Sequence, residues 1–371
     1  MKDIKYTFQH GFPAFTSVDS KTYLIKHPKI RVSELWSFWD FIVKIHCSKR
    51  GDKAKLNFFN SLIEQAKYFY KAAEDAPLKS KPLLFYYSFL NLAKIIINIK
   101  NLQLPVSVEY NHGIETSVNS STKIDNAVIS IKQLGSVKRE TNITIWSVAK
   151  MFFEEMGDNL SFQPNTPYQI QLMDCMRQCI GIHRTFCETF NEEESFFRLK
   201  FPKDNQGEDC ILKQGSIITC KATIDNCSKN NVSTLISKGY NITTNGRKNE
   251  YIESYNMGNG VYSINRQHWV HLSKQVMSKG LWSYTDGKEY RSYISTHKYP
   301  LSSASIIYVI MFFFGSITRY HPYLFENFLD KKEQWLVSEF LNTQPKQFMY
   351  LVTSKVISNN IYNSGASNIT I

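Results

Sequence analysis

Polar residues of types suited to binding an anion interrupt an otherwise apolar segment at residues 82–100. Tyr87, Asn91, Lys94 and Asn98 follow one another at spacings of four, three and four residues, which places them in one stripe on a helix. A lysine inside such an apolar helix must reach solvent, pair with an acid or bind an anion. Two interpretations stay open: a narrow solvated face from which Lys94 extends to water, or a polar groove that binds a ligand.

A second apolar segment, residues 302–320, leads into the sequence Arg-Tyr-His-Pro at residues 319–322. Cations at a helix C-terminus interact favourably with the helix dipole, and the proline ends the helix, so a purely structural role suffices. If this end meets the stripe around Lys94, Arg319 and His321 complete a basic pocket suited to phosphate. The candidate binding residues from these two segments are Tyr87, Asn91, Lys94, Arg319 and His321.

Arg177 and His183 are separated by five residues, a spacing typical of HEPN-type ribonucleases. In those enzymes the arginine stabilises charge on the scissile phosphate and the histidine acts as acid and base. The same type of spacing recurs at residues 266–271 and 291–297, so the pattern has low specificity. A ribonuclease with Arg177 and His183 as catalytic residues is therefore an alternative hypothesis.

Cys175, Cys179, His183 and Cys187 recur every four residues. On one helix the ends of this row lie ~18 Å apart, too far for a tetrahedral zinc site with bonds of about 2.0–2.3 Å. We interpret the row as a core face and assign no metal. The chain also lacks the P-loop, nucleophile-elbow, zinc-protease and Rossmann patterns, so we predict no cofactor. Enzymatic activity stays open, and the sequence favours a non-catalytic protein.

The chain of 371 residues is 43% hydrophobic, 14% aromatic and 20% charged, with a net charge of +12. This apolar content excludes a disordered chain. Residues 1–100 carry 17 basic and 8 acidic side chains, a net charge of +9, and such a segment could hold nucleic-acid phosphates. However, 34 lysines outnumber 10 arginines, and arginine is the residue that makes bidentate phosphate contacts. The predicted partners are nucleic acid (DNA or RNA) or a partner protein.

The uninterrupted apolar runs are shorter than the ~20 residues that cross a bilayer, and the first residues contain no apolar signal segment. Seven cysteines at irregular spacing argue against a disulfide framework and for a reducing compartment. We therefore predict a cytoplasmic protein that makes no membrane contact. The sequence does not indicate the oligomeric state.

Apolar periodicity predicts helices near both ends of the chain, at residues 33–46, 55–73, 82–100, 302–320, 324–341 and 347–357. Between them, residues 163–190 are also typical of a helix, whereas residues 104–148 and 195–265 contain β-branched runs typical of short strands. The predicted fold class is mainly α (α+β), a bundle of N- and C-terminal helices with a mixed middle. The predicted divisions are residues 1–103, 104–300 and 301–371.

The segment Phe58–Ile95, FFNSLIEQAKYFYKAAEDAPLKSKPLLFYYSFLNLAKI, resembles the YaaC-like family of bacterial proteins. Further matching pieces are WSFWDF from Trp36, the dipeptide His112-Gly113 and the sequence RYHP at residues 319–322. The resemblance is dense over residues 33–100 and sparse afterwards. It implies a mainly helical cytoplasmic bacterial protein without an established activity, with an association with antiviral defence, and it adds His112 to the candidate binding residues.

The leading functional hypothesis is a non-catalytic binding protein that uses a basic helical surface to engage nucleic acid or a partner protein. The HEPN-like ribonuclease is one alternative. A pocket protein for a nucleotide or small anion, built on the two apolar helices, is the other.

Overall fold

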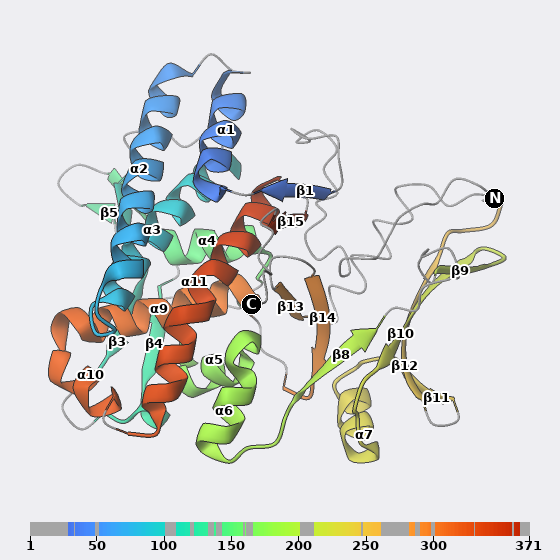
Figure 1. The fold of residues 1–371 in the computed structure, drawn as a ribbon. Coiled ribbons are helices and arrows are strands. Elements are labelled where there is room, and N and C mark those ends of the chain that lie inside the picture. Colours follow the sequence, from blue (N-terminus) through green and yellow to red (C-terminus); the bar gives the residue numbers. More distant parts are fainter. Residues whose placement is uncertain are drawn as a thin grey trace, which may run out of the picture.

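The computed structural model gives the fold of most of the chain (Figure 1). It describes residues 29–32, 34–48, 52–100, 109–118, 122–132, 137–138, 143–158, 160, 166–200, 211–245, 248–260, 282–285, 290–297, 301–329, 331–357 and 360–363.

Helices from both ends of the chain build one helical body. The N-terminal helices are α1 (Leu35–Ser48), α2 (Lys53–Asp75) and α3 (Lys81–Lys100), and the C-terminal ones are α9 (Ser303–Tyr320), α10 (Pro322–Leu329) and α11 (Glu333–Ile357). Helix α3 packs against α2, α9 and α11, and buried residues of all six helices belong to one hydrophobic cluster. The predicted mainly α (α+β) fold class is confirmed.

The ends of these helices follow from local sequence. The Asp52 side chain accepts a hydrogen bond from the Lys55 backbone N–H at the start of α2, a cap that contributes about 1 kcal/mol. Along α2, Phe59, Ile63 and Ala66 are buried at three- and four-residue spacing, so one stripe of the helix faces α3 and α1.

Helices α3 and α9 are the most apolar elements of the body. By length and composition alone, each of these helices could cross a membrane. Each helix is longer than the uninterrupted apolar runs of its sequence, which by themselves are too short to do so. Most of each is buried among other helices. Gly315 of α9 permits their close approach: an added Cβ would lie 3.2 Å from the Tyr86 Cβ and 3.3 Å from the Pro82 carbonyl oxygen.

Short strands from the first half of the middle region attach to this body. The described strands form the sheets β2 (Glu109–Asn111)–β6 (Ile143–Ser147)–β5 (Val137–Lys138) and β3 (Ile114–Ser117)–β4 (Val128–Ile131)–β7 (Tyr168–Gln171). A parallel pair, β1 (Lys29–Val32) with β15 (Asn360–Asn363), joins the two ends of the described chain. Helix α4 (Val148–Met156) follows β6 directly and packs against α3 and α9.

The second half of the middle region forms a separate lobe, drawn to the right of the helical body (Figure 1). Its described strands run in the order β11 (Ile242–Asn245), β12 (Lys248–Asn256), β10 (Ile217–Ile224), β8 (Phe196–Lys200), β14 (Tyr290–Ser295) and β13 (Trp282–Thr285), with β9 (Ile211–Gln214) also paired to β10. Strands β10 and β12 are antiparallel, from Ile217 opposite Asn256 to Thr223 opposite Glu250. The sheet and α7 (Lys229–Ser237) have a hydrophobic core of their own.

Three predicted helices differ in the structure. Residues 163–190 contain β7, α5 (Leu172–Gln178) and α6 (His183–Phe190), with a 3-10 turn from Ile180 to Ile182 between the helices. A Cβ on Gly181 would lie 2.1 Å from Nε2 of Gln344, so α11 packs directly on this turn. The two helices predicted near residues 324–341 and 347–357 instead give α10 and a single α11 that continues through Pro345.

Candidate anion-binding site

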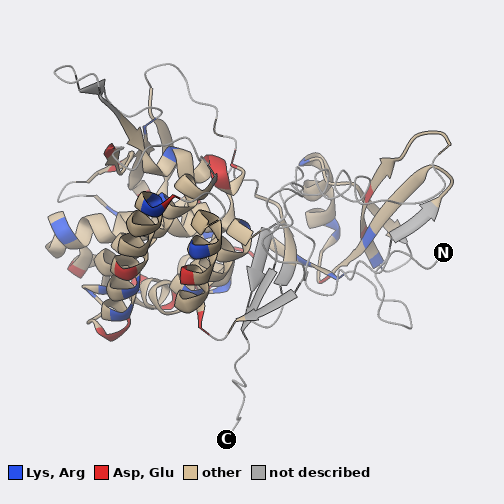
Figure 2. Ribbon diagram, turned by 90° about the horizontal axis from the view of Figure 1, so that it is seen from above, with Lys and Arg blue, Asp and Glu red and all other residues tan. Residues whose placement is uncertain are grey.

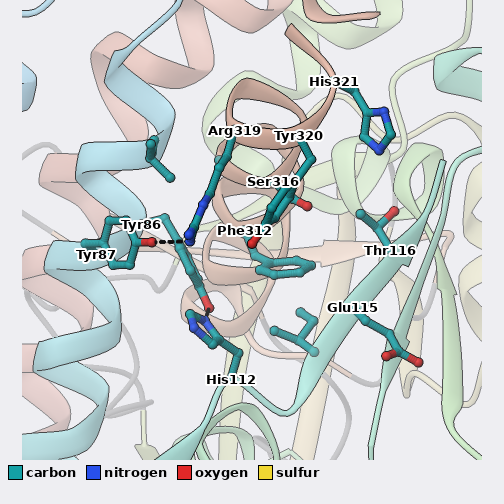
Figure 3. A pocket seen from close by; sticks show the side chains of 13 residues that line it. Tyr86, Tyr87, His112, Glu115, Thr116, Phe312, Ser316, Arg319, Tyr320 and His321 are labelled. Atoms are coloured by element: carbon teal, nitrogen blue, oxygen red, sulfur yellow. Dashed lines mark hydrogen bonds between the residues drawn. The ribbon is translucent and has the colours of Figure 1, made fainter. Parts of the chain in front are cut away.

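A cavity of about 280 Å³ lies between α3, α9 and the turn that joins β2 to β3 (Figure 3). The last turns of α9 form one wall and the N-terminal half of α3 forms another. The lining residues are Leu83, Tyr86 and Tyr87 from α3, His112 and residues 114–116 from the β2–β3 region, and Phe312, Gly315, Ser316 and residues 319–321 from α9 and its C-terminal end.

Arg319 and Tyr87 connect the two apolar helices at this cavity. The Arg319 guanidinium donates a hydrogen bond from Nη1 to the Tyr87 hydroxyl over 2.8 Å, drawn as a dashed line in Figure 3. The close crossing at Gly315, four residues before Arg319, brings the two side chains together. The guanidinium also lies 5.0 Å from the ring centroid of Tyr320. The C-terminal end of α9 therefore contacts the stripe of α3 at Tyr87.

His112 reaches the cavity because of a tight turn that requires glycine. Gly113 has φ +66°, and a Cβ there would lie 1.8 Å from the Ser147 Oγ. The His112 carbonyl accepts a hydrogen bond from the Ala149 N–H over 3.1 Å, at the start of α4. Positive φ and contact with Ser147 exclude a side chain at residue 113, so the turn holds His112 in a fixed position.

The His112 ring pairs with Tyr86 of α3. Nδ1 of His112 lies 2.5 Å from the Tyr86 hydroxyl, and the two rings stack with centroids 5.5 Å apart. Burial raises the pKa of Tyr86 well above its usual value. Burial, followed by the positive charges of Lys94 and Arg319, lowers the pKa of His112. A protonated tyrosine hydroxyl can donate to Nδ1, and in that arrangement the neutral imidazole carries its proton on Nε2.

The other residues of the predicted stripe are placed around α3 rather than gathered in the cavity. Lys94 is half-buried, and its charge is near enough to affect His112, but it does not line the cavity. Burial lowers the pKa of Lys94. Asn91 faces α2, where its Nδ2 donates to the Gln65 Oε1 over 3.3 Å.

The acidic and the basic side chain of the cavity wall differ in whether they have an ion-pair partner. Glu115 lines the cavity, but its carboxylate forms an ion pair with Lys132, with an N–O distance of 2.7 Å. In the part of the chain that the structure describes, no carboxylate lies within ion-pair distance of Arg319. His321 lines the cavity on the side away from His112 (Figure 3). The basic side chain of the cavity wall is therefore unpaired with any described carboxylate, whereas the acidic one already has a cationic partner.

Sequence reasoning missed two aromatic residues of this site, Tyr86 and Phe312. Both lie on helices whose apolar faces appear continuous in the sequence, so nothing distinguished them from core residues. Tyr86 packs edge-on against Phe312, with ring centroids 5.3 Å apart. The doublet Tyr86-Tyr87 was the one available signal that a tyrosine lies beside the stripe. Adjacent helical residues lie about 100° apart, so only one of the two tyrosines fits the stripe and the other faces a different neighbour.

Comparison with known proteins gives one match. The model of the YaaC-like protein family matches residues 22–356. The chain belongs to this family. No curated protein and no solved structure matches it.

Three separate segments on which the YaaC-like resemblance rests line the same cavity. They are the YYSFLNLAK segment with Tyr87, the dipeptide His112-Gly113, and the RYHP sequence at residues 319–322. These segments are far apart in the chain, and the fold brings side chains from each of them to one place.

The predicted catalytic pair, Arg177 and His183, lies outside this cavity. The Arg177 guanidinium bonds to both carboxylate oxygens of Glu192 over 2.8 and 2.7 Å, and to Asp174 over 2.8 Å. His183 is buried: its Nδ1 lies 2.9 Å from the Arg177 carbonyl oxygen, and its Nε2 accepts from the Ser195 N–H over 2.9 Å. These contacts tie α5, α6 and β8 together. The ribonuclease role stays a prediction.

The row of cysteines with His183 does not lie on one helix: Cys175 is in α5, Cys179 lies between α5 and the 3-10 turn, and His183 and Cys187 are in α6. All of these cysteines are buried. Among the described residues, no group of three or more histidine, cysteine, aspartate or glutamate side chains is arranged to hold a metal ion.

Proposed function

We propose that this YaaC-like protein binds a small organic anion in the cavity between α3, the β2–β3 turn and α9. The observation that carries the proposal is the Arg319 guanidinium, which Tyr87 holds at the cavity without a carboxylate partner among the described residues. The bond to Tyr87 uses one of five N–H groups, which leaves others for a ligand. Guanidinium groups match carboxylate and phosphate in a planar, bidentate way.

The charge of the site favours a ligand with two negative charges. Glu115 is neutralised by Lys132, whereas Arg319 and Lys94 contribute positive charge around His112. Neutral His112 adds an N–H donor at Nε2 without adding charge. A dianion therefore balances the two cations, and the partly closed cavity strengthens the attraction relative to open water.

The alternative of a basic helical surface for nucleic acid has less support. Figure 2 shows lysine and arginine positions interspersed with aspartate and glutamate along the helices of the body. Interspersed charge is typical of an ordinary solvated surface. Three predictions stay predictions: binding to DNA, RNA or a partner protein, a cytoplasmic location, and a role in antiviral defence. A salt titration tests the binding to nucleic acid.

The test compares ligand-induced stabilisation in matched variants. Thermal unfolding of the wild type is measured with increasing inorganic phosphate, and the same series is run for Arg319→Gln and Arg184→Gln. Arg184 is an exposed arginine of α6, paired with Glu194 and outside the cavity. At a ligand concentration ten times Kd, the wild type gains about 1.4 kcal/mol.

We expect Arg184→Gln to keep this gain and Arg319→Gln to lose it. Equal stabilisation of all three proteins would indicate a general ionic effect and would contradict the proposal, as would no stabilisation of the wild type.

A further inference from the structure

The cavity has more room and more apolar wall than a bare anion needs. Its volume of about 280 Å³ is close to the lower limit of the ~300–1,000 Å³ of small-molecule sites. Leu83, Ile114 and Phe312 contribute apolar surface beside the polar end. A bare phosphate would leave this surface in contact with water, which an apolar group on the ligand would displace.

The aromatic side chain of Tyr320 is exposed to solvent at the edge of the cavity. Tyr320 is 62% exposed although it is large and largely apolar, and Figure 3 shows it beside Ser316 on the wall formed by α9. Arg319 covers part of its ring. Arginine and an aromatic ring side by side form a surface on which another flat ring can stack.

The cationic groups and the aromatic groups adjoin one another on α9. Arg319 and Tyr320 are consecutive residues, and Phe312 lies two turns earlier on the same helix. A ligand whose dianion contacts Arg319 and the Nε2–H of His112 therefore has its remaining part next to Phe312 and Tyr320. Phosphate is the common biological group that carries close to two negative charges at neutral pH.

We infer that the cavity takes an aromatic phosphomonoester, in which a flat ring and a phosphate dianion are joined in one small molecule. This inference rests on the proposed anion site and assigns its ligand class. The phosphate contacts Arg319 and His112, and the ring packs against Phe312 and Tyr320. Nucleoside monophosphates and simple aryl phosphates share this chemistry.

The experiment is calorimetric titration with inorganic phosphate, phenyl phosphate and adenosine monophosphate at one pH and ionic strength. Stacking on an aromatic side chain contributes about 1–3 kcal/mol per ring, so phenyl phosphate should bind at least about fivefold more tightly than phosphate. Adenosine monophosphate, compared with phenyl phosphate, distinguishes a nucleotide from a smaller aryl ligand within the class.

Two exposed tyrosines provide a matched pair of variants. Tyr320→Ala should weaken phenyl phosphate binding about fivefold more than it weakens inorganic phosphate binding. Tyr68→Ala should change neither, because Tyr68 is 61% exposed on α2 and lies outside the cavity. Both substitutions are at exposed positions, so the fold is expected to tolerate them.

The outcomes separate this inference from the proposal beneath it. Equal affinity for phosphate and phenyl phosphate would overturn the aromatic ligand and leave the anion site in place. An equal loss of both affinities in Tyr320→Ala would also overturn it, because the tyrosine would then serve the anion. Absence of saturable binding by any of the three probes would overturn both.

Discussion

The hydrogen bond between Tyr86 and His112 links the tautomer of the histidine to the tyrosine. Tyr86 stays protonated because it is buried, and its hydroxyl can donate to Nδ1 when the neutral imidazole carries its proton on Nε2. Lys94 and Arg319 favour that neutral form by repelling a third positive charge. The site therefore offers a dianion an arginine and a neutral N–H donor, and it keeps the histidine ready to take up a proton when a bound anion offsets the two cations.

The first prediction concerns the pH dependence of stability at His112. Its pKa in the fold lies below the ordinary value of 6.5, so the unfolded chain takes up the proton first as the pH falls. The contribution of His112 to stability is complete above pH 6.5 and declines as the pH falls toward the lowered pKa. His112→Asn should therefore show a smaller loss of unfolding free energy than the wild type between about pH 8 and 5, measured by urea denaturation. Parallel curves would contradict the lowered pKa.

At the scale of elements, the crossing of α3 and α9 positions Arg319. A side chain at residue 315 would press on Tyr86 and on the Pro82 carbonyl, and overpacking of this kind costs about 1–3 kcal/mol. We predict that Gly315→Leu lowers the free energy of unfolding by this amount and also abolishes phosphate binding, because the helices must separate at the cavity.

Arg319→Gln is the control for this second prediction. It removes the anion contact at an exposed position, so it should abolish binding while stability changes little. If Gly315→Leu is destabilised but binds phosphate with unchanged affinity, the crossing does not position the site.

The N-terminal end of α9 depends on a buried carboxylate. Asp158 accepts hydrogen bonds from the Ser302 backbone N–H over 2.6 Å and from the Ser302 hydroxyl over 3.3 Å, and Ser302 caps the helix. Burial raises the pKa of Asp158 to about 6, against the opposing effects of Ser305, Ser302 and Lys355.

The third prediction follows from that raised pKa. Between the ordinary value of 3.8 and about 6, the folded protein binds the proton more readily than the unfolded chain does. Stability from this group is therefore complete below pH 3.8 and is lost as the pH rises through about 6. Relative to Asp158→Asn, the wild type should lose about 1–3 kcal/mol of unfolding free energy between about pH 4 and 7. A constant difference between the two proteins across this range would contradict the raised pKa.

The elements that the sequence predicted well are those whose signal is local. Helices α2, α3 and α9 have strong apolar periodicity or caps, and their bounds fall close to the predicted ones. The packing of Gly181 against Gln344 of α11, at the break between α5 and α6, could not be predicted, because the two residues are far apart in the chain. The sequence predicted two helices at residues 324–341 and 347–357, yet α11 continues through Pro345 among buried neighbours.

The candidate site was predictable in part for a geometric reason. At 100° per residue, Asn91 lies about 40° to one side of Tyr87 and Lys94 about 20° to the other. The stripe is therefore wide enough to face two neighbours, which is why Asn91 contacts α2 while Tyr87 faces the cavity. Tyr86 and Phe312 were not predicted as site residues. An aromatic residue within an apolar helical segment gives the same sequence pattern whether it lies in a core or beside a cavity.

At the scale of the whole molecule, the helical body and the sheet lobe each have a hydrophobic cluster, and Phe196 of β8 and Tyr293 of β14 pack in the cluster of the body. The residues that line the cavity come from α3, from α9 and its C-terminal end, and from the β2–β3 region that attaches to the body. The early and late parts of the chain are therefore both required to form the site. Among the described residues, the lobe contributes none to the lining of the cavity.

The central claim is that an anion binds at Arg319 inside this cavity, and a crystal structure of the protein soaked with phenyl phosphate tests it most directly. The account predicts phosphate density within hydrogen-bond distance of the Arg319 guanidinium and the His112 Nε2, with the phenyl ring against Phe312 and Tyr320. A ligand bound only elsewhere on the molecule, with the cavity free of it at a concentration well above the measured Kd, would contradict the account.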